Sequence, residues 1–237
     1  MIRVPILEPT LTDAELIVTG RLVDASNATL LCELMVDPNN PRKVVYKPIA
    51  GERPLWDFPE GTLANREVAA YKVSEFSGLK VVPTTVMRGG PFGPGAVQEW
   101  IDIDESVDLI ALAQSGVEEI RKMAFFDYII NNTDRKFGHI LFTPQGEVLG
   151  CDHGVSFHEV FKLRTVLWQF AGIELSDSEN EVLDKFLKSC NQLTDLLNPF
   201  LSSNEIEALL LRVAHLKSAG RFPYPSPDWP AVPWPPV

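Results

Sequence analysis

The chain changes character near residue 105, and this change limits the folds that it can adopt. Before that point, short runs rich in branched apolar residues alternate with turn-forming clusters, which is typical of strands. After it, longer segments of helix-forming residues dominate. Strands and helices that are segregated along a chain predict an α+β fold rather than alternating β-α units. We therefore expect two lobes, with a boundary near residues 102–106.

The first lobe is predicted to be a small, mainly β sheet with one helix. A polar loop with prolines and glycines precedes the one segment that is rich in helix formers, and Thr62 is a candidate N-cap there. GGPFGPG (89–95) suits a hairpin loop between the last two strands. The predicted strands cover residues 15–23, 28–36, 42–48, 80–89 and 95–103, and the predicted helix covers residues 62–76.

The second lobe is predicted to be mainly helical, with one strand hairpin inside it. Ser115 and Glu118 resemble a capping box at the start of its first helix, and Gly220 is a plausible stop for its last. The predicted elements are a helix over residues 117–131, a hairpin over residues 139–143 and 147–151, and helices from about residue 160 to residue 219.

These patterns divide the chain into an N-lobe (residues 1–103), a helical C-lobe (residues 104–220) and a C-terminal tail (residues 221–237). The tail contains seven prolines and two tryptophans, a composition that favours polyproline II. It can dock in the groove of a partner, or it can pack as a strap on its own domain.

Composition excludes several classes of partner. The formal net charge of −11 argues against nucleic acid and anionic membranes, because phosphate backbones and acidic lipids are bound by Lys and Arg. The chain has no run of about 18 apolar residues, so no membrane span is expected, and its first residues do not resemble a signal peptide. Three cysteines without metal-like spacing suggest a reduced compartment. We therefore expect a cytoplasmic protein.

Three segments, VVYKP, NNTDRKFGHIL and GCDHG, together supply the groups that phosphoryl transfer needs. That reaction requires cations on the phosphates, ligands for a divalent metal and a carboxylate near the attacking hydroxyl. Lys47 ends the third predicted strand, and Glu67 lies in the predicted helix, where it can pair with Lys47. Asp134 begins the loop after a long helix, and Asp152 follows the hairpin.

The spacing of these residues matches a known pattern. His139 follows Asp134 by five residues, the offset from Asp to Asn in the kinase catalytic loop H-R-D-x-x-x-x-N. Asp152 follows thirteen residues later and precedes His-Gly, so that DHG stands where kinases have D-F-G. On these motifs, residues 15–215 resemble the phosphatidylinositol 3- and 4-kinase and HipA-type branch of the protein-kinase-like superfamily. They resemble more closely an uncharacterised actinobacterial family of phosphatidylinositol-kinase-like proteins.

The resemblance implies a two-lobed kinase-like fold and an ATP-dependent phosphotransferase that uses Mg²⁺ or Mn²⁺. It implies that Asp134 is the catalytic aspartate and that Asp152 is the principal metal ligand. Lys47 would bind phosphate with Glu67 as its partner, and Arg135 would either hold a phosphate or orient the loop. The adenine-contacting hinge would be formed by Gln98, Glu99, Trp100 and Ile101.

Three features depart from the pattern of that branch. His139 replaces the usual Asn as the second metal ligand, and an imidazole suits Mn²⁺ or Zn²⁺ better than Mg²⁺. Lys136 replaces the histidine of the branch. No glycine-rich GxGxxG loop is present, so that the phosphate-covering turn would be residues 24–27, which offers backbone N–H groups and the Ser26 hydroxyl.

Each of these residues alone has a plainer interpretation. Lys47 could be a solvated lysine, Asp134 and Asp152 could be turn residues, and His139 could be a buried core histidine. Glu60 or Glu75 could take the place of Glu67. Because His139 replaces Asn and the glycine-rich loop is missing, a nucleotide-binding pseudokinase or scaffold is an alternative to a kinase, and a nucleotidyl transferase is a third possibility. For a kinase, the expected acceptor is a small polar molecule or a protein hydroxyl.

Overall fold

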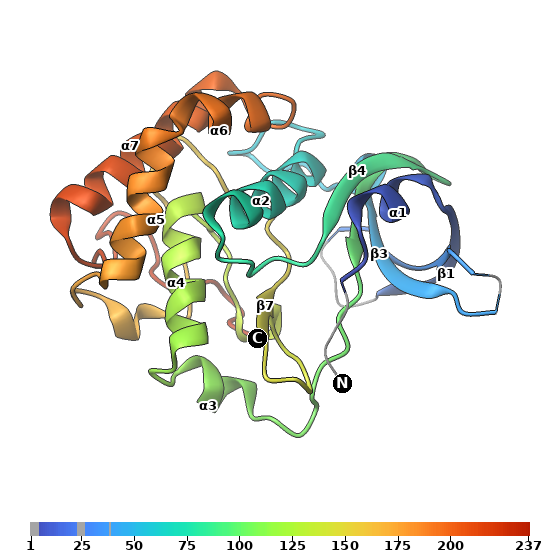
Figure 1. The fold of residues 1–237 in the computed structure, drawn as a ribbon, viewed down its shortest axis with the longest axis horizontal. Helices are drawn as coiled ribbons and strands as arrows, with labels where there is room; N and C mark the ends of the chain where they lie inside the picture. The colour runs from blue at the N-terminus through green and yellow to red at the C-terminus, as the bar shows by residue number, and fades with distance from the viewer. Residues whose placement is uncertain (1–4, 23–26, 38) are drawn as a thin grey trace.

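The N-lobe is built on a five-stranded antiparallel sheet with the strand order β1-β2-β3-β5-β4 (Figure 1). The structure is a computed structural model that describes residues 5–22, 27–37 and 39–237. The strands are β1 (Glu15–Leu22), β2 (Thr29–Met35), β3 (Arg42–Pro48), β4 (Thr85–Gly90) and β5 (Gly93–Glu99). The five predicted strands are therefore confirmed, but with two main changes in bounds. The fourth begins at Thr85 rather than at residue 80, since Pro83 has no N–H for a strand ladder, and the last ends at Glu99 rather than at residue 103, where the chain leaves the sheet towards the second lobe.

A short helix that the sequence did not predict, α1 (Glu8–Asp13), covers one face of this sheet. Leu11 of α1 is fully buried in the same apolar cluster as Leu34, Val44 and Val97 of the strands. Arg88 of β4 donates hydrogen bonds to carbonyl groups at the C-terminal end of α1. A helix of only six residues with mixed composition carries too little periodicity to be distinguished from a loop in the sequence, and tertiary packing stabilises it here.

Helix α2 (Leu63–Ser77) lies between the two lobes (Figure 1). Its first turns pack Ala64 and Val68 against Ala96 of the sheet, and its later residues join the core of the second lobe. Thr62 does not cap it: the Thr62 hydroxyl donates to a carbonyl of the preceding loop instead. Both carboxylate oxygens of Glu52 accept hydrogen bonds from the first backbone N–H groups of α2, at 3.1 and 2.8 Å. A residue that is distant along the chain therefore caps this helix.

Replacing Glu52 with alanine is expected to lower the free energy of unfolding by about 1 kcal/mol, because two N–H donors of α2 lose their acceptor. The matched control is Glu60→Ala, which removes an exposed carboxylate from the same loop. Denaturant unfolding of both variants measures the difference. An equal loss in both would contradict the capping role of Glu52.

The second lobe contains five helices and one hairpin within the described part of the chain. They are α3 (Leu109–Ala113), α4 (Glu118–Ile130), β6 (Ile140–Phe142), β7 (Val148–Gly150), α5 (Asp177–Lys188), α6 (Cys190–Leu197) and α7 (Ser203–Ala219). Short 3-10 turns cover Phe137–His139 and Trp168–Phe170. The predicted long helix, the hairpin and the stop at Gly220, which has a left-handed backbone, are confirmed.

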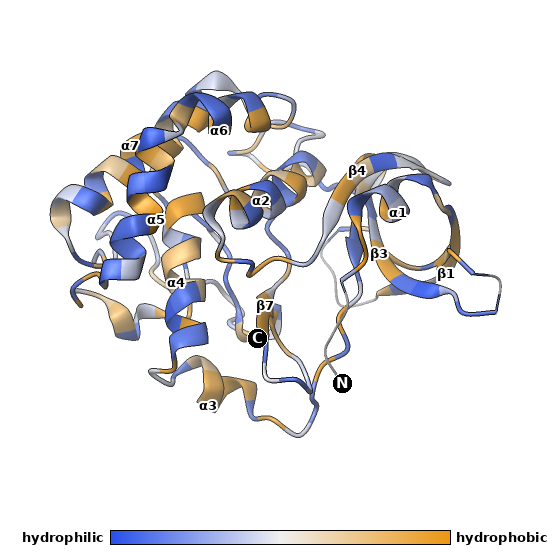
Figure 2. Ribbon diagram, in the orientation of Figure 1, coloured by the Kyte–Doolittle hydropathy of each residue, from blue (hydrophilic) through white to orange (hydrophobic). Residues whose placement is uncertain are grey.

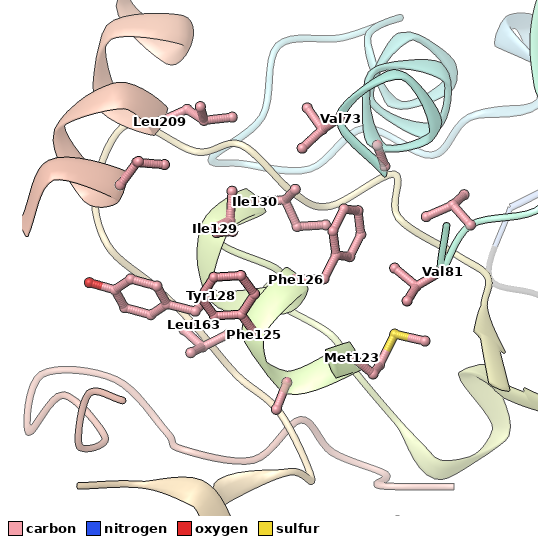
Figure 3. Close-up of a cluster of buried hydrophobic side chains, with 14 of the residues drawn as sticks. Val73, Val81, Met123, Phe125, Phe126, Tyr128, Ile129, Ile130, Leu163 and Leu209 are labelled. Atoms are coloured by element: carbon pink, nitrogen blue, oxygen red, sulfur yellow. The ribbon is translucent and has the colours of Figure 1, made fainter. Parts of the chain in front are cut away.

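The core of this lobe surrounds α4. In Figure 2 this helix changes from hydrophilic at the end next to α3 to hydrophobic at its other end. Figure 3 shows its side chains meeting Val73 of α2 and Leu209 of α7 in one cluster. No helix of the described residues is long and apolar enough to cross a membrane.

Two predictions about this lobe are wrong. The capping box of Ser115 and Glu118 does not form, because α4 begins after Val117, which makes no side-chain cap. Helices do not fill residues 160–219, since α5 begins only at Asp177 and the preceding segment contains a single 3-10 turn. The backbones of residues 164 and 166 are hydrogen-bonded instead to the loop that follows α4, and these tertiary bonds override the local helical preference of the segment.

Candidate active site

A cleft of about 500 Å³ lies where the sheet faces the β6–β7 hairpin and the connection between the lobes. Its lining contains apolar residues of the sheet, such as Val45, and of the hairpin, such as Leu141. Lys47, His139 and Asp152 lie at one end of it. The cleft therefore combines apolar walls with a few charged groups at one end, as is common for sites that bind small molecules.

The four predicted hinge residues line this cleft: Gln98, Glu99, Trp100 and Ile101. Gln98 and Glu99 end β5, and the side-chain amide of Gln98 donates to the Thr85 hydroxyl at 2.9 Å. The backbone N–H of Trp100 donates to the carbonyl of Lys43, which ties the connection to β3. The structure therefore places this segment along one wall of the cleft.

Lys47 connects two carboxylates from different lobes. Its ammonium group lies 2.9 Å from Oδ1 of Asp152 and also contacts Oε1 of Glu67. The second oxygen of Glu67 accepts a hydrogen bond from the backbone N–H of His153 at 3.1 Å. Of the three glutamates considered from the sequence, Glu67 is therefore the one that α2 directs at Lys47.

The charges of Lys47, Glu67 and Asp152 influence the pKa values of one another. Burial lowers the pKa of Lys47, but the attraction of Asp152 and Glu67 outweighs it and raises the pKa above the usual lysine value. The positive charge of Lys47 holds the pKa of Asp152 well below its usual range. Burial raises the pKa of Glu67, and the contact with Lys47 opposes this. At neutral pH, Lys47 is therefore a fixed cation and Asp152 is a carboxylate with about half of its side chain exposed.

His139 completes this end of the cleft. Its Nε2 lies 3.4 Å from Oδ2 of Asp152, and its Nδ1 is buried without a hydrogen-bond partner among the described residues. Burial lowers the pKa of His139 to about 4, so that the ring is neutral at neutral pH. A neutral imidazole beside a carboxylate fits a divalent metal ion. No group of three or more His, Cys, Asp or Glu side chains in the described part of the chain is placed to hold a metal ion, so phosphate oxygens and water would have to complete its coordination.

The backbone supports this placement of Asp152. Its φ of 59° is in the left-handed region, which is uncommon for residues other than glycine. Hydrogen bonds hold both neighbours, because the Cys151 N–H donates to the carbonyl of His139 and the His153 N–H donates to Glu67. Such a conformation persists only where the surroundings impose it, and it is most frequent at functional sites.

Asp134 lies on the other side of the charged group. It lines a smaller cavity together with Lys47, Glu67 and Asp152. Its Oδ2 is 3.3 Å from the ammonium of Lys136, and 30% of its side chain is exposed. Burial raises the pKa of Asp134, and Lys136 opposes this. The Asp134 carboxylate is therefore partly exposed and borders the same cavity as Asp152.

Arg135 does not face this cavity. Its side chain is fully buried and forms two hydrogen bonds with the buried carboxylate of Asp127, at 2.9 and 2.8 Å. It also donates to the carbonyl groups of His139 and Cys151. Arg135 therefore cannot reach a phosphate in the cavity. Its contacts agree with the alternative role, which is to orient the loop. Gly150 leaves room for the guanidinium, because a Cβ there would lie 3.0 Å from it.

His153 lies beneath the same guanidinium. Nη2 of Arg135 is 2.8 Å from its Nε2, and because arginine can only donate, His153 accepts this bond as a neutral ring. Burial and then the charge of Arg135 lower the pKa of His153 well below its usual value. His153 therefore supports Arg135 and does not reach the cleft.

The metal-free protein is expected to lose stability as the pH falls from about 7 to about 5. An unfolded histidine has a pKa of about 6.5, so that below this pH the unfolded chain binds a proton that folded His153 does not. The contribution of His153 to the free energy of unfolding is complete above about pH 6.5 and falls by about 1.4 kcal/mol for each pH unit below that value. Denaturant unfolding with EDTA present should show a slope shallower by this amount in His153→Gln. Equal slopes in the two proteins would contradict a neutral, buried His153.

Two residues of the site were missed from the sequence. Asp127, the partner of Arg135, stands in an otherwise apolar stretch of α4, and a charge at such a position needs a partner, which was the available indication. Glu52, which lines the smaller cavity beside Asp134, stands in a polar loop with no such indication. Ser26, the predicted phosphate contact, lies outside the described residues.

Comparison with known proteins places the chain in a family. No family model matches it. Protein Rv2133c of Mycobacterium tuberculosis is 38% identical over 261 aligned positions, which cover 95% of this chain and 93% of that protein. The chain belongs to the Rv2133c family. A second relative, phosphatidylinositol 4-kinase gamma 4 of Oryza sativa subsp. japonica, is 32% identical over 130 positions, which cover 47% of this chain but only 23% of that protein.

Solved structures show the fold of this member of the Rv2133c family. Hydra Fam20, solved with sugar, superimposes with a TM-score of 0.62 at 17% identity, covering 89% of this chain and 86% of that one. The Golgi casein kinase with Mn/ADP bound superimposes with a TM-score of 0.63 at 14% identity, covering 93% of this chain and 79% of that one. The predicted two-lobed, protein-kinase-like α+β fold is therefore confirmed.

Proposed function

We propose that this protein is an ATP-dependent phosphotransferase. The observation that carries the proposal is that Lys47, Glu67, Asp134 and Asp152 line one cavity, with Lys47 paired to both Glu67 and Asp152. This arrangement offers a fixed cation for phosphate oxygens, a carboxylate for a metal and a second carboxylate for the attacking group. The kinase-like fold and the partial similarity to a phosphatidylinositol 4-kinase support it.

The adenine of ATP would occupy the apolar part of the cleft along residues 98–101, with its phosphates towards Lys47. Glu67 would hold the Lys47 ammonium in place, and that ammonium would bind phosphate oxygens. Asp152 and His139 would hold the divalent ion, which supplies charge neutralisation on the phosphates. Asp134 would orient the acceptor hydroxyl and accept its proton while the acceptor oxygen bonds to the γ-phosphorus and the bond to ADP breaks.

We propose Mn²⁺ as the better of the two metals, with Mg²⁺ as the alternative. His139 offers an imidazole nitrogen, which binds Mn²⁺ more readily than the hard Mg²⁺ ion. The Golgi casein kinase structure, which contains Mn/ADP, shows that the fold accommodates this metal and nucleotide in that protein.

The acceptor is proposed to be a small polar molecule or a protein hydroxyl. The cavity beside Asp134 is bordered by polar and charged residues such as Asn27 and Glu52, which suit a hydrophilic acceptor. The net charge of −11 makes an anionic bilayer an unfavourable surface.

The test is incubation of the purified protein with ATP labelled at the γ- or the α-phosphate, with Mn²⁺ or Mg²⁺. A phosphotransferase transfers only the γ-label to the protein, to an added acceptor or to water. Transfer of the α-label would instead support a nucleotidyl transferase. ATP binding without transfer of either label would support a pseudokinase, a reading that the histidine at position 139 favours.

A further inference from the structure

The C-terminal tail follows a defined path over the second lobe. It leaves α7 after Gly220, and Phe222 exchanges backbone hydrogen bonds with Gly172 and Ile173 at 3.0 and 2.9 Å. The Phe222 ring is buried, with the Arg121 guanidinium 5.0 Å from its centroid. Further on, the ammonium nitrogen of Lys162 lies over the ring of Trp229, 4.7 Å from its centroid. These contacts fix the tail to its own domain at two points.

Beyond Trp229, the tail reaches the loop that carries the catalytic groups. In Figure 1 the C-terminus lies beside the β6–β7 hairpin, which this loop precedes. The carbonyl of Pro236 accepts a hydrogen bond of 2.9 Å from the backbone N–H of Phe137. Phe137 stands between Asp134 and His139 and begins a 3-10 turn, whose first N–H groups have no partner inside the turn. The tail therefore supplies an acceptor that the loop itself lacks.

The tail also contacts the loop indirectly, through residues 164–168, which lie between the loop and the tail. The backbone of Arg135 forms two hydrogen bonds of 3.1 Å with residues 164 and 166, one in each direction. The outer side of this segment is held by the carbonyl of Ala231, which accepts from the Thr165 N–H at 3.0 Å and from the Trp168 indole N–H at 2.7 Å. The loop, this segment and the tail thus form three hydrogen-bonded layers.

We propose that the carbonyl groups of Ala231 and Pro236 position the catalytic loop (residues 134–139), so that the tail is part of the active site. The expected effect of the tail on turnover rests on the proposed phosphotransferase function. The expected effect of the tail on the order of the loop does not depend on that function. A displacement of about 1 Å in a catalytic group can reduce a rate about 100-fold. Among the described residues, the hydrogen bonds and ring contacts of the tail given above join it to neither Lys47 nor the hinge, so the tail is expected to affect turnover and not the metal-independent affinity for ATP.

The test compares a chain that ends at Pro235 with a chain that ends at Pro236. The first removes the acceptor for the Phe137 N–H, and the second, the matched control, keeps an oxygen on Pro236. In the shorter chain, hydrogen exchange of the Phe137 amide should accelerate at least about tenfold, and turnover should fall about 10- to 100-fold. The dissociation constant for ATP measured with EDTA, which does not depend on the metal ligand His139, and the global unfolding transition should stay as in the control.

A second pair of variants probes the other contact. Trp168→Phe removes the indole N–H that binds Ala231 and keeps an aromatic ring, whereas Trp234→Ala changes a tail residue that is 85% exposed. Turnover should fall in the first variant only.

Unchanged exchange of the Phe137 amide in the chain that ends at Pro235 would overturn the proposal. Faster exchange with unchanged turnover would also overturn it, because the contact would then not position catalytic groups. If the complete chain transfers no phosphate, the phosphotransferase function fails, and the exchange measurement alone decides whether the tail holds the loop.

Discussion

Replacing Asp127 with asparagine is expected to lower the free energy of unfolding by about 3–5 kcal/mol. The side chains of Asp127 and Arg135 are both fully buried, and the change leaves the guanidinium charge without its counter-charge while hardly altering the volume of the side chain. Because domains of this size are stable by only about 5–15 kcal/mol, the variant should unfold at a much lower denaturant concentration. Equilibrium unfolding of the wild type and the variant measures this difference.

The matched control is Asp184→Asn. Asp184 pairs with Lys217 at 2.9 Å, nearly the same distance, but 41% of its side chain is exposed, and surface ion pairs contribute only about 0–1 kcal/mol. Arg135→Gln and the double variant with Asp127→Asn complete a cycle, in which the double variant should lose less than the sum of the single losses. Additive losses, or an equal loss in Asp184→Asn, would contradict a buried ion pair that holds the catalytic loop.

Replacing Asp134 with asparagine is expected to reduce phosphate transfer about 10²- to 10⁴-fold, because the acceptor hydroxyl loses its general base. The amide has the same shape as the carboxylate, so ATP affinity and stability should change little. Transfer of the γ-phosphate and binding of ATP with Mn²⁺ are the two measurements.

Asp195→Asn, an exposed position on α6, is the control for this loss of charge. It should retain full transfer. If Asp134→Asn also transfers phosphate at the rate of the wild type, Asp134 has no catalytic role.

The candidate site was largely predictable because its residues follow strong local patterns. Lys47, Asp134 and Asp152 each stand near the end of a strand, helix or hairpin that the composition predicts. The spacing from Asp134 to His139 and from His139 to Asp152 matches the kinase motifs. The structure brings these three residues together in one cavity. The pairing of Glu67 with Lys47 could be predicted on the single assumption that the predicted helix packs between the lobes.

The supporting contacts were not predictable, because they depend on tertiary structure. Glu52 caps a helix that begins eleven residues later, and nothing in the loop sequence indicates this. Residues 160–176 have enough apolar content for a helix, but the N–H groups of residues 164 and 166 donate to the loop after α4, and those of residues 165 and 172 donate to the tail. Arg135 stands beside Asp134, and only the fold shows that its side chain is buried against Asp127 and points away from the cavity.

The central claim, that ATP binds in this cleft with a metal held by Asp152, is tested most directly by calorimetric titration of the protein with ATP. We expect binding that is at least about tenfold tighter with Mn²⁺ than with EDTA, because an ionised ligand contact contributes about 1.5–3 kcal/mol. Asp152→Asn should abolish this metal dependence, and Asp195→Asn should keep it. An absence of ATP binding by the wild-type protein, or the same metal dependence in Asp152→Asn, would contradict the claim.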